Sequence, residues 1–133
     1  DMGAITANKL VPMLSVDDIE KTVNYYVDGL GFRKKSEWIK DGRLRWCMLE
    51  YEGGAAIMAQ EHDPESGPEG KRGDGMTMYV MCDDAPSFYK MVIGRGIEAN
   101  EPFIGNGMHV VDLIDPDGYR ISFESPTDEP DTH

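Results

Sequence analysis

Residues 13–18 read Met-Leu-Ser-Val-Asp-Asp, and residues 79–84 read Tyr-Val-Met-Cys-Asp-Asp. In both stretches a mostly apolar, strand-like run ends in paired aspartates, and the two stretches lie 66 residues apart. A second match joins Ile57-Met58-Ala59 to Ile121-Ser122-Phe123 at an offset of 64 residues. Because the offset changes by only two residues between these matches, the sequence predicts an internal duplication.

The first repeat is predicted to contain one helix and four strands. An apolar run from Leu10 to Val16 precedes Asp17, which forms a capping-box pattern with Glu20 and predicts the start of a helix. Apolar residues at spacings of three, four and seven predict one helix face, made of Ile19, Val23, Tyr26, Val27 and Leu30. Strand-like runs follow at 35–40, 44–51 and 55–60, joined by Asp-Gly and Gly-Gly turn signals.

The second repeat restarts the same pattern. A strand is predicted at 76–82, and the helix that follows is capped by Asp83-Asp84 and ends near Gly94. Two further strands, at 109–114 and 119–124, flank the turn signal at 115–118. The first repeat therefore shows a complete βαβββ order and the second shows three of the four strands. Because the second repeat duplicates the first, we predict two βαβββ modules and the fold class α+β.

The length of 133 residues favours a single domain over residues 1–133. Its first module is expected at about 9–60 and its second at about 76–125. Residues 61–75 are rich in Pro, Gly and charge and are predicted to form a linker. Residues 126–133 are predicted to form a flexible tail.

The charge balance excludes some classes of partner. The chain has 13 Lys and Arg against 25 Asp and Glu, a formal net charge of −12, so neither nucleic acid nor an anionic membrane surface is an expected partner. No apolar run approaches the length of a membrane helix, and residues 1–8 show no secretory signal. Cys47 and Cys82 lie in strand-like runs and are expected to be buried, reduced thiols, which favours a cytoplasmic location.

Three motifs, in this order along the duplicated pattern, carry a family resemblance. They are Val16-Asp17-Asp18, Tyr25-Tyr26 before Gly29-Leu30-Gly31-Phe32, and Asp115-Pro116-Asp117-Gly118-Tyr119 before the last strand. With the repeat, they resemble the vicinal-oxygen-chelate superfamily of glyoxalase I, bleomycin-resistance proteins and extradiol dioxygenases. The resemblance covers roughly residues 10–125 and implies two tandem modules that form a curved mixed sheet around a cup-shaped cleft.

The same resemblance identifies the positions where a metal would bind. In the metal-dependent members each module supplies one ligand from its first strand and one from its last, typically His, Gln or Glu. In this sequence those positions hold Val11, Met58, Thr77 and Ser122. None of these is a usual ligand of a divalent cation, and neither flanking residue at any position supplies one. We therefore expect no metal and no cofactor, and the isolated His62 and the terminal His133 are expected to be solvated.

Strand alternation predicts which side chains face the cleft instead. On the four strands that carry the ligand positions, the cleft-facing candidates are Met13, Ser15, Met58, Gln60, Thr77, Tyr79, Met81, Arg120, Ser122 and Glu124. Trp38, Trp46 and Phe103 are candidate stacking surfaces for a flat ligand, and Asp112 with Glu124 would attract a cation. This mixture of polarisable and hydrogen-bonding side chains is typical of a small-molecule pocket.

These residues favour a metal-independent binding protein of the bleomycin-resistance type that sequesters an aromatic or cationic compound such as an antibiotic. The resemblance also implies a homodimer. The alternative is a glyoxalase-like lyase, isomerase or dioxygenase with an unconventional or absent metal site, in which Tyr79, Glu124 or His109 would perform acid-base chemistry. No catalytic residue is assigned, and a protein-interaction module remains a third alternative.

Overall fold

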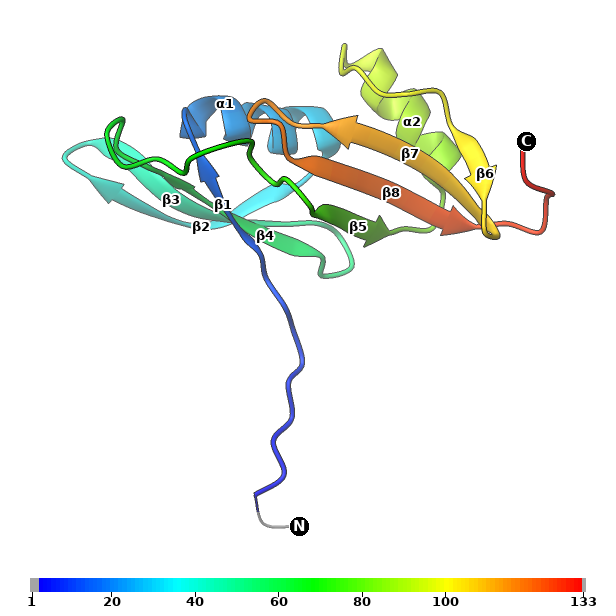
Figure 1. The fold of residues 1–133 in the computed structure, drawn as a ribbon, viewed down its shortest axis with the longest axis horizontal. Helices are drawn as coiled ribbons and strands as arrows, with labels where there is room; N and C mark the ends of the chain where they lie inside the picture. The colour runs from blue at the N-terminus through cyan, green and yellow to red at the C-terminus, as the bar shows by residue number, and fades with distance from the viewer. Residues whose placement is uncertain (1–2, 133) are drawn as a thin grey trace.

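The structure of the chain is a computed structural model that describes residues 3–132. The first module contains a short α-helix that continues as a π-helix and four strands: β1 (Met13–Val16), α1 (Ile19–Val23), η1 (Asn24–Leu30), β2 (Arg33–Lys40), β3 (Arg43–Glu50) and β4 (Ala56–Glu61). The second contains β5 (Thr77–Met81), α2 (Ala85–Gly94), β6 (Phe103–Gly105), β7 (Met108–Ile114) and β8 (Arg120–Pro126). Each module thus has the predicted βαβββ order (Figure 1).

The strands form two four-stranded mixed sheets. Their orders are β1-β4-β3-β2 and β5-β8-β7-β6, and the first strand of each module runs parallel to its last. The α+β class and the tandem modules are confirmed. The strands of the mixed sheet are divided into these two halves, and no hydrogen-bonded ladder joins the halves among the described residues.

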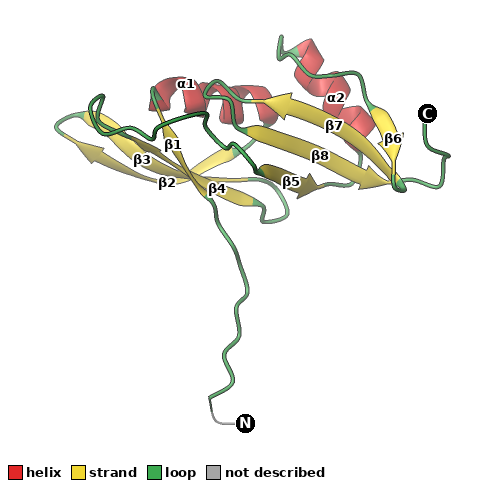
Figure 2. Ribbon diagram, in the orientation of Figure 1, coloured by secondary structure: helices red, strands yellow, loops and turns green. Residues whose placement is uncertain are grey.

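The helices lie on one side of both sheets, and the opposite side carries no helix or strand of the described chain (Figures 1 and 2). We call this opposite side the uncovered face. The amino-terminal arm, residues 3–12, leaves the molecule on that side (Figure 1). No helix in the described part of the chain is long and apolar enough to cross a membrane.

The predicted alternation of side chains is present in the strands. Leu14 and Val16 on β1 and Ile121 and Phe123 on β8 are almost fully buried beneath the helices. One aromatic cluster joins the two modules there: Tyr51 of the first module meets Phe123 at 5.5 Å between ring centroids, and Phe88 stacks on Phe123 at 3.8 Å. The two modules therefore share one hydrophobic core.

The starts of the helices show why one cap was predicted correctly and one was not. Asp18, not Asp17, caps α1 by accepting the backbone N–H groups of Glu20 and Lys21. The Asp17 carboxylate is instead occupied by Arg72 and His62. In the second module Asp84 caps α2, as predicted, and accepts the N–H of Ser87.

The segment predicted to be a linker is tied to both modules. The Arg72 guanidinium contacts the carboxylates of Asp17 at 2.8 Å and Asp117 at 3.2 Å, and it donates to the carbonyl oxygen of Ser15. His62 is also not a solvated side chain, because its Nε2 lies 2.7 Å from Asp17 Oδ1. We call Asp17, His62, Arg72 and Asp117 the clasp. The composition of residues 61–75 did not predict that this segment is held in place. Two ion pairs of Arg72, one to each module, hold it where apolar contacts are missing.

Three further boundaries differ from the prediction. Glu61 ends β4, where its side chain is buried, and it is not part of a linker. The stretch around Phe103, where no strand was predicted, pairs with β7 as the three-residue strand β6. Pro126 completes β8, and the N–H of Thr132 donates to the carbonyl of Ile104, so the expected tail is hydrogen-bonded to β6. His133 lies outside the described residues.

Candidate functional site

In the first module the predicted site residues lie on the uncovered face of one sheet. Met13 on β1, Met58 on β4 and Met48 on β3 are direct cross-strand partners and form one row. The neighbouring row contains Ser15, Gln60, Trp46 and Trp38, again in register. Trp38 is 52% exposed and Met13 53%, so this surface is largely apolar and open to solvent.

The second module carries a more polar surface at the corresponding place. Tyr79 on β5, Ser122 on β8 and Asp112 on β7 form its central row. The rows on either side contain the remaining predicted residues of this sheet: Thr77 and Arg120 in one, Met81, Glu124 and Phe103 in the other. Ser122 and Glu124 are buried, and the Ser122 hydroxyl donates to Glu124 Oε2 at 2.9 Å.

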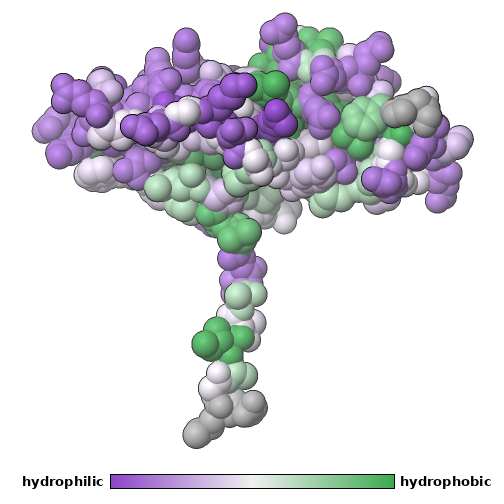
Figure 3. All heavy atoms as spheres, viewed as in Figure 1, coloured by the Kyte–Doolittle hydropathy of each residue, from purple (hydrophilic) through white to green (hydrophobic). Residues whose placement is uncertain are grey.

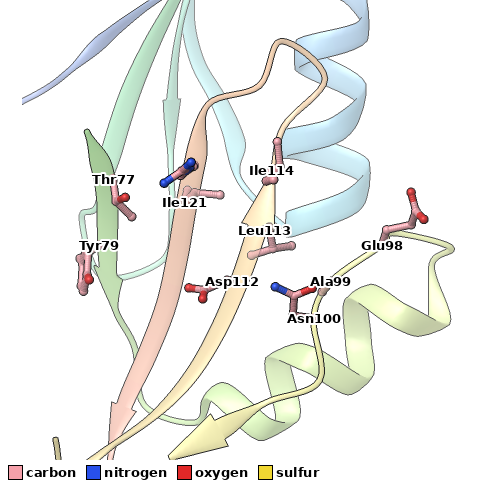
Figure 4. Close-up of a pocket in the computed structure, with 10 residues that line it drawn as sticks. Thr77, Tyr79, Glu98, Ala99, Asn100, Asp112, Leu113, Ile114 and Ile121 are labelled. Atoms are coloured by element: carbon pink, nitrogen blue, oxygen red, sulfur yellow. The ribbon is translucent and has the colours of Figure 1, made fainter. Parts of the chain in front are cut away.

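A pocket of about 550 Å³ opens on this second surface. It gathers four of the predicted residues, Thr77, Tyr79, Asp112 and Arg120, from three different strands. Figure 4 shows the first three of them around the pocket. Its volume lies within the range of small-molecule sites. The predicted residues of the first module do not line it, and Trp38 borders a separate hollow of about 270 Å³.

Sequence reasoning missed part of the pocket wall. Glu98, Ala99 and Asn100 come from the segment between α2 and β6, and Ile114 comes from the end of β7 (Figure 4). The Asn100 N–H donates to the carbonyl of Asp112, which places this segment beside β7. The segment has no periodicity or motif that could have identified it, although Ile114 follows Asp112 at the strand spacing of two.

Met13, Met58 and Met81 are predicted to face one cleft, and the structure places them on two different sheets. Met13 and Met58 are neighbours, but Met81 belongs to the other sheet, and Met48 takes the third place. Met48 is absent from the predicted set because the strand-alternation prediction considered only the first and last strands of each module. Met48 lies on the third strand, where alternation also directs it to the uncovered face.

The residues at the four expected metal positions do not fit a divalent cation. Val11 is apolar, Met58 lies opposite Met13, and the Ser122 hydroxyl is directed to Glu124. Across residues 3–132, no group of three or more His, Cys, Asp or Glu side chains converges in a way that could hold a metal. His109 on β7 contacts only one carboxylate, that of Glu129 at 3.3 Å, within the described residues.

The charged groups of the pocket are unpaired. Arg120 is exposed and Asp112 half-buried, and neither is within an ion-pair distance of any oppositely charged side chain of the described chain. Glu98 adds a second carboxylate at the rim. The pocket therefore presents a guanidinium, two carboxylates, two hydroxyls and an amide beside the ring of Tyr79 and the side chain of Ile114, which suits a ligand with both flat and polar parts.

Comparison with known proteins places this arrangement among related folds. A family model described as glyoxalase superfamily protein matches residues 1–129. No curated protein sequence matches the chain significantly. Among solved structures, TnmS3, an antibiotic binding protein from Streptomyces sp. CB03234, superposes with a TM-score of 0.73 at 18% identity and covers 93% of this chain and 100% of its own.

Two further structures agree with this result. TioX from Micromonospora sp. ML1 superposes with a TM-score of 0.71 at 18% identity, covering 90% of this chain and 99% of its own. A glyoxylase/bleomycin resistance protein/dioxygenase domain from Frankia sp. EAN1pec gives 0.74 at 13% identity, with coverages of 95% and 96%. At these identities the similarity establishes the fold.

Proposed function

This chain belongs to the glyoxalase superfamily, and from that premise we propose that it binds a small aromatic or cationic molecule, such as an antibiotic, without a metal. The carrying observation is the pocket of the second module, where Tyr79 and Ile114 lie beside unpaired polar groups. The similarity to the antibiotic binding protein TnmS3 supports this reading. The unsuitable side chains at Val11, Met58, Thr77 and Ser122 argue against chemistry that depends on a metal at those positions.

We further propose that the protein acts as a homodimer. Several large apolar side chains of the uncovered face are about half exposed or more: Met13, Trp38, Tyr79, Met81 and Ile114. In the space-filling view, apolar side chains gather on this side around the base of the amino-terminal arm (Figure 3). Apolar surface of this kind is typical of protein interfaces. Sedimentation velocity at several concentrations tests the dimer.

A reducing, cytoplasmic environment is the compartment we propose. Cys47 and Cys82 are free, and burial raises the pKa of the Cys47 thiol to about 11. A protonated, buried thiol reacts slowly with oxidants and electrophiles. Cys47 therefore serves packing, whereas Cys82 is only partly buried, which differs from the expectation of a buried thiol.

The binding proposal is tested by thermal unfolding against a panel of polycyclic and amine-bearing antibiotics, using protein treated with a chelator. A ligand at about 100 times its Kd should raise the free energy of unfolding by roughly 2.7 kcal/mol. We expect at least one compound to raise the melting temperature, and its effect to survive chelation. If no compound shifts the melting temperature, or if binding requires a divalent cation, the proposal is wrong.

A further inference from the structure

The pocket contains a positive and a negative side chain, Arg120 and Asp112, on two neighbouring strands. Arg120 on β8 is the cross-strand partner of Ile114, and Asp112 on β7 is the partner of Ser122. Arg120 and Asp112 are therefore diagonal neighbours on the same face, with backbones about 7–8 Å apart. A ligand lying between them would have an anionic and a cationic group a few bonds apart.

Arg120 is unusual among the six arginines of the chain. Arg33, Arg43, Arg45 and Arg72 each lie within 4.0 Å of a carboxylate. Arg95 donates to the carbonyl oxygen of Gly29. Arg120 alone has neither an ion pair nor a hydrogen-bond acceptor within residues 3–132, although it borders the pocket. A guanidinium without a partner at this place is suited to a carboxylate, which it binds with two parallel hydrogen bonds.

The overall charge restricts which anions can reach it. A chain with a net charge of −12 repels a net anion, and Asp112 and Glu98 add two carboxylates to the same pocket. An acid that also carries an amine avoids this repulsion, because its cationic group can pair with Asp112. The flat part of such a molecule would lie against Tyr79 and Ile114, which are 63% and 65% exposed.

We propose that the pocket recognises an aromatic zwitterion, with its acid group on Arg120, its amine on Asp112 and its ring against Tyr79. This inference rests on the proposed binding function and narrows it to a ligand class. It adds an anionic group to the aromatic and cationic character considered above. The Asn100 amide, beside Asp112, supplies a further hydrogen-bonding group at the same end of the pocket.

Three probes with the same aromatic ring measure how much the acid and the amine each contribute to binding. They are 3-(2-naphthyl)alanine, which has both groups, 2-(2-naphthyl)ethylamine, which lacks the acid, and 3-(2-naphthyl)propionic acid, which lacks the amine. Titration of ¹⁵N-labelled protein by NMR measures each affinity and also reports whether residues 77–79 and 112–114 are perturbed. We expect the zwitterion to bind about tenfold more tightly than either analogue.

Two substitutions assign the charges to residues. Arg120→Gln should weaken binding of the zwitterion and the acid by about tenfold and leave the amine unchanged. Asp112→Asn should weaken binding of the zwitterion and the amine and leave the acid unchanged. The controls are Lys90→Gln, at an exposed position of α2, and Asp128→Asn, at an exposed position near the carboxyl end. They change the net charge by the same amounts but lie outside the pocket.

The outcomes distinguish this inference from the broader function. If the amine binds as tightly as the zwitterion and Arg120→Gln changes nothing, the zwitterion inference is wrong and an aromatic cation remains the ligand. The inference is also wrong if the probes perturb Trp38 and Trp46 in place of the pocket, or if none of them binds while an antibiotic of the panel does. If neither the probes nor the antibiotics bind, both proposals fail.

Discussion

The two modules form equivalent hydrogen bonds to backbone N–H groups but differ in the side chains of their uncovered faces. In each module the last strand supplies an acceptor for the first N–H of the helix: Glu61 accepts from Ile19 at 3.0 Å, and Ser125 accepts from Ala85 at 2.8 Å. The final turns also correspond. Tyr51 N–H bonds to Ala55 O in one, and Asp115 N–H bonds to Tyr119 O in the other, at the same 64-residue offset.

The uncovered faces diverge at equivalent positions. The central row is Met13, Met58 and Met48 in the first module and Tyr79, Ser122 and Asp112 in the second. The hydrogen bonds at the start of the helix and in the final turn satisfy backbone N–H groups, so both modules need them. The side chains of the uncovered faces are not needed for these hydrogen bonds. The face of the first module could therefore become apolar and that of the second module polar.

The largest expected effect comes from Asp115, because the equivalent position of the first module holds Tyr51 and therefore no carboxylate. Its buried carboxylate accepts the N–H groups of Asp117 and Tyr119 and the hydroxyl of Tyr26 at 2.8 Å. Asp115→Ala leaves these donors unpaired, so we expect a loss of about 3 kcal/mol and a fall in melting temperature of about 10 °C. Chemical denaturation with urea measures the change.

Asp83→Ala is the matched control, since Asp83 is exposed and makes no side-chain hydrogen bond within the described residues. It should change the free energy of unfolding by less than about 0.5 kcal/mol. An equal effect of the two substitutions would show that the loss reflects net charge and would contradict the role given to the Asp115 hydrogen bonds.

The second comparison is between Glu61 and Ser125, which accept equivalent helix N–H groups. Glu61 also accepts from Arg43, so Glu61→Ala should cost about 2 kcal/mol near neutral pH, and Ser125→Ala about 1 kcal/mol. Burial disfavours the ionised Glu61 side chain, but the Ile19 N–H and the Arg43 guanidinium outweigh it, and the net pKa is lowered.

The pH dependence separates these two contributions. A carboxyl whose folded pKa is lowered stabilises the protein above its unfolded pKa of about 4.3, and this contribution is lost as the pH falls through the folded pKa. The difference between wild type and Glu61→Ala should therefore shrink between about pH 5 and pH 3, while that for Ser125→Ala stays constant. Parallel pH profiles for both variants would contradict the assignment of the charge effect to Glu61.

The duplication was readable from the sequence because it is recorded in local patterns. Paired aspartates, turn signals and strand alternation predicted the first βαβββ module, all of the second except the short strand β6, and the buried sides of β1, β4 and β8. The clasp and the pocket wall depend on contacts between distant residues, such as Arg72 with Asp17 and the 98–100 segment with β7. No local pattern encodes these contacts, so the polar composition of residues 61–75 predicted only a linker.

A smaller effect is expected at the clasp, which joins the modules. Arg72→Gln removes both cross-module ion pairs, and because Asp17 is well exposed we expect a loss of only about 1 kcal/mol. Limited proteolysis should then cut within residues 62–75 faster than in wild type. Lys71→Gln, at an exposed neighbour without an ion pair in the described chain, should leave the cleavage rate unchanged.

His62 gives the clasp a pH dependence of opposite sign to that of Glu61. Its hydrogen bonds to the Asp63 carbonyl and the Asp17 carboxylate raise its pKa. A raised folded pKa gives stability that is complete below the unfolded pKa of about 6.5 and is lost as the pH rises through the folded pKa. Cleavage in wild type should therefore accelerate with rising pH relative to His62→Gln, and a pH-independent ratio would contradict this role.

The smallest effects on stability, and the most direct test of the divergent faces, are expected at Met13 and Tyr79. Both side chains occupy the same place in their modules and are more than half exposed, so Met13→Leu and Tyr79→Leu should each change the free energy of unfolding by less than about 0.5 kcal/mol. Ligand binding should distinguish them. Loss of the Tyr79 ring should weaken an aromatic ligand about tenfold, whereas Met13→Leu should not, because Met13 lies outside the pocket. Equal weakening by both substitutions would mean that the two faces contribute to one site, and the apolar first module would then be part of the binding surface.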